Sequence, residues 1–147
     1  MRDGYMRDDP VFVAWQAGRV ELGDAEASWR ALVAQAVARG VDVRRARIVS
    51  EPLSDYVRFE YDITERHNIA AGEQVRWLPR RQATPLALPG NDFWLFDDST
   101  LLVNHFSGNG DWTASEPVTD SEAVKLCSTA FEAVWSRAVP HSEYRPA

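Results

Sequence analysis

The chain has 147 residues and a net charge of −6, with 45% hydrophobic and 26% charged residues, as expected of one globular domain. The negative charge disfavours a general nucleic-acid binder, because such proteins draw most of their affinity from basic groups placed on phosphates. A single cysteine, Cys127, excludes an internal disulfide, and a single lysine, Lys125, leaves arginine as almost the only basic residue.

Neither a membrane span nor a secretion signal is evident in the sequence. No apolar run approaches the ~20 residues that cross a bilayer as a helix. The start, MRDGYMRDDP, is polar and acidic, unlike a signal peptide. We therefore expect a cytoplasmic protein without a membrane partner.

Two helices are predicted near the N-terminus. Residues 9–17 fit a short helix, because Asp9 is a suitable N-cap and Pro10 suits the first helical position. After a linker at 19–23, residues 24–39 predict a longer helix, capped by Asp24 and ended by Gly40. Its expected apolar face consists of Trp29, Leu32, Val33, Ala36 and Val37.

A strand, a helix and a second strand are predicted next. Residues 41–50 carry apolar side chains on both parities, which indicates an inner strand, and Arg47 within it would need an acidic or carbonyl partner. Between Pro52 and Gly72 we prefer a helix, with Ser54 or Asp55 as its N-cap. The segment DYVRFEYDI also fits a strand. The face of this helix would hold Tyr56, Phe59, Glu60, Ile63 and His67. Residues 73–80, ended by Pro79, form the second strand.

Three short strands and a last helix complete the chain after a proline-bearing loop. The strands are expected at 92–97, 100–106 and 112–118, with a tight turn at Asp98-Ser99 and a glycine-rich hairpin loop. The helix is expected at 119–138, capped by Thr119 or Asp120, with Val124, Cys127, Phe131, Val134 and Trp135 on one stripe.

This order predicts a single α/β domain spanning 1–147, with its core at about 24–138. A helix between the two early strands implies a right-handed crossover and a parallel pair. The three later strands should extend the same mixed sheet, with helices on both faces.

The stretch NDFWLFDDST, residues 91–100, tests that arrangement. Trp94 and Phe96 point to one side and Phe93 and Leu95 to the other, which indicates a strand in the centre of the sheet. The acids at its ends suit turn and capping roles. Asp92 and Asp97 are also candidate partners of arginines.

Familiar catalytic and metal-binding patterns are missing from the sequence. His67, His105 and His141 match no zinc spacing, and Asp97-Asp98 alone is a weak cation signal. No G-x-S-x-G motif surrounds Ser50, and no glycine-rich phosphate loop follows either early strand. Cys127 reads as a small core residue. No metal or cofactor is expected.

The candidate site is a polar cluster where the two parallel strands end. Carboxyl ends of strands in open α/β sheets are common ligand sites. The cluster consists of Ser50, Glu51, Tyr56, Arg80 and Arg81, with Arg47, Asp92 and Asp97 as further candidates. It would form a ligand or partner site, or else an ion-pair network that holds loops together.

Three stretches, RIVSEPLSDYVRFEY, AAGEQVRWLPR and DFWLFDD, resemble an uncharacterised family of small actinobacterial proteins, over about residues 1–144. Such proteins are often encoded beside helix-turn-helix regulators and have no established activity. The resemblance implies a regulatory partner. It also implies that relatives carry a leading helix before Met1.

A weaker resemblance, in fold, is to one half-domain of the phospholipase D-like enzymes. It rests on the AQAVARGVDVR helix and strand, the LPR and DFWLFDD strands, a hairpin and the final FEAVWSRA. Those enzymes use H-x-K-x-x-x-x-D, whose histidine is the nucleophile and whose lysine holds phosphate. Here Phe106 and Ser107 follow His105, so the resemblance implies a degenerate, non-catalytic version.

The absent catalytic sets and the family resemblance favour a non-enzymatic regulatory or sensor domain acting with a helix-turn-helix transcription regulator. Its arginine-rich edge would engage a partner surface or a small anionic ligand, without direct nucleic-acid contact. Two alternatives stay open. One is a phosphodiesterase or nuclease-like enzyme using His105, and the other is one component of a toxin–antitoxin pair.

Overall fold

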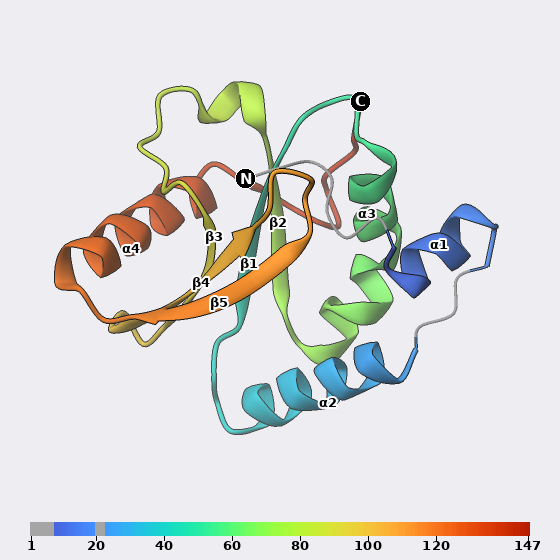
Figure 1. The fold of residues 1–147 in the computed structure, drawn as a ribbon, viewed down its shortest axis with the longest axis horizontal. Coiled ribbons are helices and arrows are strands. Elements are labelled where there is room, and N and C mark those ends of the chain that lie inside the picture. The colour runs from blue at the N-terminus through green and yellow to red at the C-terminus, as the bar shows by residue number, and fades with distance from the viewer. Residues whose placement is uncertain (1–7, 20–22) are drawn as a thin grey trace.

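The computed structural model describes residues 8–19 and 23–147, and within them the chain is a mixed α/β domain (Figure 1). The helices are α1 (Pro10–Gln16), α2 (Asp24–Ala38), α3 (Asp55–His67) and α4 (Ser121–Trp135), with short 3-10 turns η1 (Ile69–Ala71) and η2 (Arg80–Ala83). The strands are β1 (Arg44–Val49), β2 (Gln74–Pro79), β3 (Asp92–Phe96), β4 (Thr100–Phe106), β5 (Trp112–Val118) and β6 (Val139–Pro140).

The strands of the described residues form two separate three-stranded sheets. Sheet A has the order β1-β2-β6, with β1 and β2 parallel and joined through α3, which confirms the predicted crossover pair. Sheet B is the antiparallel meander β3-β4-β5. The α/β class is confirmed, but the meander does not extend sheet A.

The two strands predicted to be central, β1 and β3, are therefore edge strands. The prediction was wrong because apolar side chains at both odd and even positions show only that both faces of a strand are covered. They do not show whether another strand pairs along its edge. Helices cover both faces of β1, as the pattern required, and no strand within residues 8–19 and 23–147 pairs with its outer edge.

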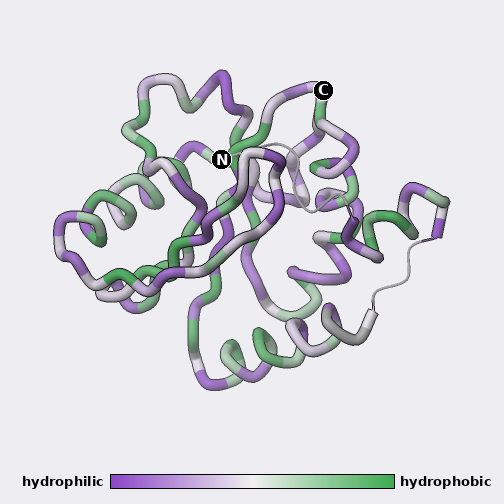
Figure 2. The backbone as a smooth tube through the Cα atoms, in the orientation of Figure 1, coloured by the Kyte–Doolittle hydropathy of each residue, from purple (hydrophilic) through white to green (hydrophobic). Residues whose placement is uncertain are grey.

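Helices α3 and α4 pack on opposite faces of sheet A. On one face Trp77 contacts Tyr61 of α3, with ring centroids 5.5 Å apart. On the other, Leu78 packs with Val134 of α4, and the Arg76 guanidinium lies 4.4 Å from the Trp135 ring. Figure 2 shows hydrophobic and hydrophilic residues alternating along the helices, as expected when one face of each is buried.

Helix starts follow the sequence signals closely. Asp9 caps α1 by accepting from the Val11 N–H at 2.8 Å, and Asp120 caps α4 by accepting from the Ala123 N–H at 2.9 Å. Ser54 caps α3, and this region is a helix as preferred over the strand alternative.

Three local predictions need correction. The N-cap of α2 is Gly23, so the helix already includes Asp24. Leu32 is 58% exposed because α2 rests on the rest of the fold along a narrow stripe around Val33 and Val37. The β3–β4 turn centres one residue earlier than expected: Asp97 and Asp98 have φ of 49° and 50°, as in type I′ turns.

Candidate functional site

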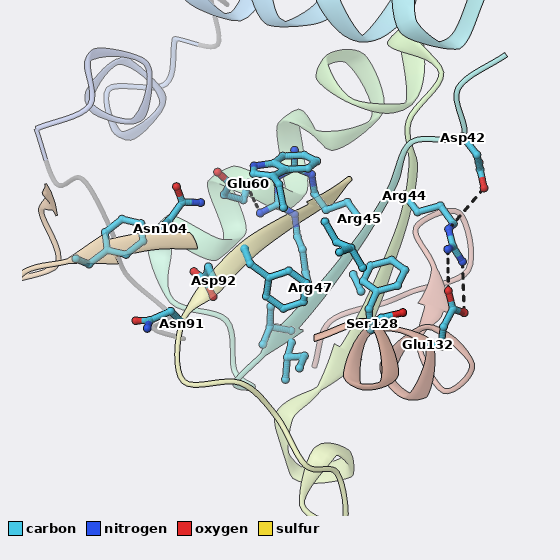
Figure 3. A pocket seen from close by; sticks show the side chains of 18 of the residues that line it. Asp42, Arg44, Arg45, Arg47, Glu60, Asn91, Asp92, Asn104, Ser128 and Glu132 are labelled. Atoms are coloured by element: carbon cyan, nitrogen blue, oxygen red, sulfur yellow. Dashed lines mark hydrogen bonds and ion pairs between the residues drawn. The ribbon is translucent and has the colours of Figure 1, made fainter. Parts of the chain in front are cut away.

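A cavity of about 540 Å³ lies where the two sheets approach each other (Figure 3). We call it the inter-sheet groove. Its lining comprises all of β1, residues 91–95, Asp42, Tyr56, Val57, Glu60, Asp97, Asp98, Asn104, Phe106, Ser128, Phe131 and Glu132. The volume falls within the range of ordinary ligand pockets.

The groove runs along the edges of β1 and β3 and not over one face of either. Successive side chains of a strand point to opposite faces, yet consecutive residues of both strands line this one space. In addition, Glu60 comes from α3 and Glu132 from α4, and these helices cover opposite faces of sheet A. The space therefore opens through the gap between the two edge strands.

The arginines of β1 are held by carboxylates and aromatic rings. Arg44 donates from Nη2 to Oε1 of Glu132 at 2.7 Å, and its guanidinium lies 4.9 Å from the Phe131 ring centroid. Arg45 donates from Nε to Oε1 of Glu73 at 2.5 Å and stacks 4.7 Å from the Trp94 ring centroid. Arg45 and Trp94 thus bring the two sheets into contact beside the groove.

Arg47 forms an ion pair with Glu60 of α3, which confirms that this arginine has an acidic partner. Burial lowers the pKa of the Arg47 guanidinium, and the charge of Glu60 opposes that shift. Burial, followed by the same carboxylate, raises the pKa of Tyr56, whose hydroxyl donates to Glu60 at 3.2 Å. Within the described residues, Arg47 Nε is buried without a hydrogen-bond partner.

Negative charge predominates around the groove. Three arginines line it, against the six carboxylates of Asp42, Glu60, Asp92, Asp97, Asp98 and Glu132, which gives a net charge of −3 when all are ionised. Asp92 and Asp97, predicted as arginine partners, both lie in this lining. The predicted small anionic ligand would meet an unfavourable field here.

The predicted polar cluster divides into two. Tyr56, Arg47, Asp92 and Asp97 line the groove, whereas Ser50, Glu51, Arg80 and Arg81 meet at the carboxyl ends of β1 and β2. There the guanidinium of Arg80 donates from Nε to Ser50 Oγ at 3.0 Å and from Nη2 to the Ile48 carbonyl at 3.1 Å. Arg80 thus braces the main chain of β1.

Glu51 completes this second group. The Tyr144 hydroxyl donates to Glu51 Oε1 at 2.7 Å, and Arg81 Nη2 lies 4.0 Å from Glu51 Oε2. The pKa of Tyr144 is raised, first by burial and then by Glu51. These contacts fit the ion-pair network that was the alternative to a ligand site.

One face of sheet B was missed by sequence reasoning. Directly opposed residues share a face, so the register places Trp94, Phe96, Leu102 and Asn104 together. Ser115 joins them, because its hydroxyl donates to Asn104 Oδ1 at 2.8 Å and accepts from the Trp112 indole at 3.3 Å. We call this surface the open face.

The open face carries half-exposed aromatic side chains: Phe96 is 51% and Trp112 53% exposed. The opposite face of sheet B packs through Leu101 on Val124 and Cys127 of α4. The alternating pattern of β3 predicted two apolar faces, but nothing in it told which one a helix would cover.

The remaining nucleophile candidates lie apart from the groove. His105 Nε2 is 3.0 Å from Glu116 Oε2, and His105 does not line the groove. Cys127 is a buried core residue, as predicted, and burial raises the pKa of its thiol. In the described residues, no three His, Cys, Asp or Glu side chains converge as a metal site would need.

The fold and the groove define a small α/β domain whose two sheets approach each other at the edge strands β1 and β3. Residues 1–146 match the family described as domain of unknown function DUF6879, and the chain belongs to this family. No curated protein and no solved structure matches the chain. The predicted membership of an uncharacterised family is confirmed, while actinobacterial origin and the phospholipase D-like resemblance stay predictions. No helix among residues 8–19 and 23–147 has the length and apolar character of a membrane span.

Proposed function

We propose that this protein is a non-enzymatic, partner-binding regulatory domain that acts in the cytoplasm with a helix-turn-helix transcription regulator. The observation that carries the proposal is the open face, where Phe96 and Trp112 expose half of their surface on a sheet whose other face is packed. Exposed aromatic patches of this kind are typical of protein interaction surfaces.

The state of the arginines supports binding over phosphoryl chemistry. The Arg44, Arg45 and Arg47 guanidiniums each pair with a carboxylate, and Arg80 holds main-chain and hydroxyl oxygens of its own chain. A phosphate group in the groove would have to displace these partners and approach an excess of negative charge.

The regulator is proposed because the family resemblance places such proteins beside helix-turn-helix genes. DNA-binding domains carry basic surfaces, and a chain with net charge −6 complements them. Binding would change the activity of the regulator only if the two states of the regulator bound this domain with different affinity.

Co-purification with the regulator encoded next to the gene, followed by calorimetric titration, tests the proposal. Because aromatic residues dominate interface energetics, Trp112→Ser should weaken binding at least about tenfold. Leu32→Ser is the matched control, since Leu32 is equally exposed but lies on α2; it should leave the affinity unchanged.

Three results would contradict the proposal. The first is absence of binding by the wild-type chain, and the second is equal loss in both variants. The third is hydrolysis in a phosphodiester panel that disappears in His105→Ala, which would instead favour an enzyme. Growth arrest on expression, relieved by the neighbouring protein, would point to a toxin–antitoxin pair.

A further inference from the structure

We infer that the inter-sheet groove accepts an extended, lysine- or arginine-bearing segment of the partner, which pairs with β1 and joins the two sheets. This inference rests on the proposed function and adds to the open face a second contact surface for the same partner. It follows from the backbone of β1, the position of β3, the helices on either side and the charge of the lining.

The backbone of β1 offers hydrogen-bonding groups on the groove side. The Gln74 N–H of β2 donates to the Val43 carbonyl at 2.9 Å, so the odd-numbered residues of β1 turn their main chain toward β2. The even-numbered ones then turn away from β2, and of these the Ile48 carbonyl already accepts from Arg80. The N–H and C=O of Ala46, in the middle of the strand, face the groove.

The opposite wall of the groove is a second sheet edge. In the described residues β3 pairs with β4 alone, and four of its five residues line the space. A segment lying between β1 and β3 would therefore have a strand on each side. Pairing at an exposed sheet edge is a common way for a folded domain to bind an extended peptide.

The two faces of such a segment would also be covered. Tyr56 and Val57 of α3 line the groove from one side of sheet A, and Phe131 of α4 lines it from the other. Alternate side chains of the segment would therefore contact these residues, which favours an apolar or amphipathic strand.

The charge of the groove selects cationic side chains. Its arginines already have carboxylate partners, and Asp97 and Asp98 add negative charge to the lining just after the end of β3. A lysine or arginine of the inserted segment near that end would be attracted there, whereas an acidic segment would be repelled.

A pair of variants at one position tests the inference. Ala46→Pro removes the N–H that faces the groove and places a ring there, while Ala46→Ser keeps the N–H and the small size. Titrated with the intact regulator, Ala46→Pro should bind at least about tenfold more weakly than the wild type, and Ala46→Ser within about twofold. Far-UV circular dichroism and thermal melting of both variants show whether they fold.

Overlapping 12-residue peptides covering the regulator provide a second measurement on the wild-type chain, independent of how Ala46→Pro folds. One basic peptide should bind, and it should lose binding when its backbone is N-methylated at alternate residues or its lysines and arginines are replaced by glutamate. Tight binding of the N-methylated peptide would overturn the inference.

The outcomes separate the two proposals. If the wild-type chain does not bind the regulator at all, both the proposed function and this inference are contradicted. If the regulator binds both Ala46 variants equally, or binds through a helix and no peptide competes, the function stands and the groove inference alone fails.

Discussion

Glu73 is a buried charged residue that forms a close ion pair with Arg45. Its side chain is fully buried, accepts from Arg45 at 2.5 Å and accepts from the Asn68 amide at 2.7 Å. Removing it would leave Arg45 without its carboxylate and Asn68 without its acceptor in an apolar setting.

We therefore predict that Glu73→Ala lowers the free energy of unfolding by about 3–5 kcal/mol, the usual cost of breaking a buried pair. The neighbouring Gln74→Ala removes only an exposed hydrogen bond to Asp42 and should cost under about 1 kcal/mol. Urea unfolding of both variants decides the matter, and similar losses would mean that Glu73 is not buried in solution.

Trp77 and Trp94 differ in burial, although the sequence suggested that Trp94 was central. Trp77 is completely buried among Tyr61, Tyr144 and His141, so Trp77→Ala should cost about 3–5 kcal/mol. Trp94 lies on an edge strand and is partly exposed, so Trp94→Ala should cost clearly less. Chemical denaturation with the reverse ranking would place β3 inside a continuous sheet.

His141 links stability to pH. Its Nδ1 accepts the Trp77 indole N–H at 3.1 Å, and burial lowers its pKa below the ordinary 6.5. Below pH 6.5 the unfolded chain binds a proton before the native one, so stability is complete above that pH and declines as the pH falls toward the native pKa.

His67, whose pKa burial also lowers, adds an effect of the same sign. We expect His141→Gln to reduce, without abolishing, the loss of unfolding free energy between about pH 7.5 and about pH 5.5. Urea titrations at the two pH values measure this, and an unchanged loss would show that His141 is not buried as a neutral ring.

At the scale of elements, two glycines of similar backbone conformation allow the cost of backbone strain to be distinguished from the cost of a steric clash. Gly40, after α2, and Gly72, after η1, have φ of +87° and +96°. A Cβ at Gly40 would meet no atom within 4 Å, whereas one at Gly72 would lie 3.0 Å from Val37 of α2.

Gly40→Ala should therefore cost about 1–2 kcal/mol, the strain of a left-handed alanine. Gly72→Ala should cost at least about 1 kcal/mol more, because Val37 must also move. Adding Val37→Ala to Gly72→Ala should recover part of that excess. Thermal melts with equal losses at the two glycines would contradict the close packing of α2 on η1.

The sequence was most informative about elements with local signals. Asp9, Ser54 and Asp120 are side-chain caps that act within their own helix, so the starts of α1, α3 and α4 could be predicted. The buried face of α2 was predicted only in part: Val33 is buried and Trp29 packs on Trp94, but Leu32 stays exposed.

For the whole molecule, the sequence predicted the order of elements, the parallel β1–β2 pair and helices on both faces of sheet A. The split into two sheets could not be predicted, since residue patterns report faces and not which edges meet. The candidate site was therefore predicted only in part. Ser50 and Arg80 lie together as expected, but Tyr56 and Asp92 line a groove that exists only because β1 and β3 remain apart.

Amide hydrogen exchange of Ala46, followed by NMR in the free chain and in its complex with the regulator, tests the central claim most directly. Among the described residues no strand pairs with this edge of β1, so the amide should exchange rapidly in the free chain and far more slowly in the complex. An amide already protected in the free chain, or one that exchanges equally fast in both, would contradict the account.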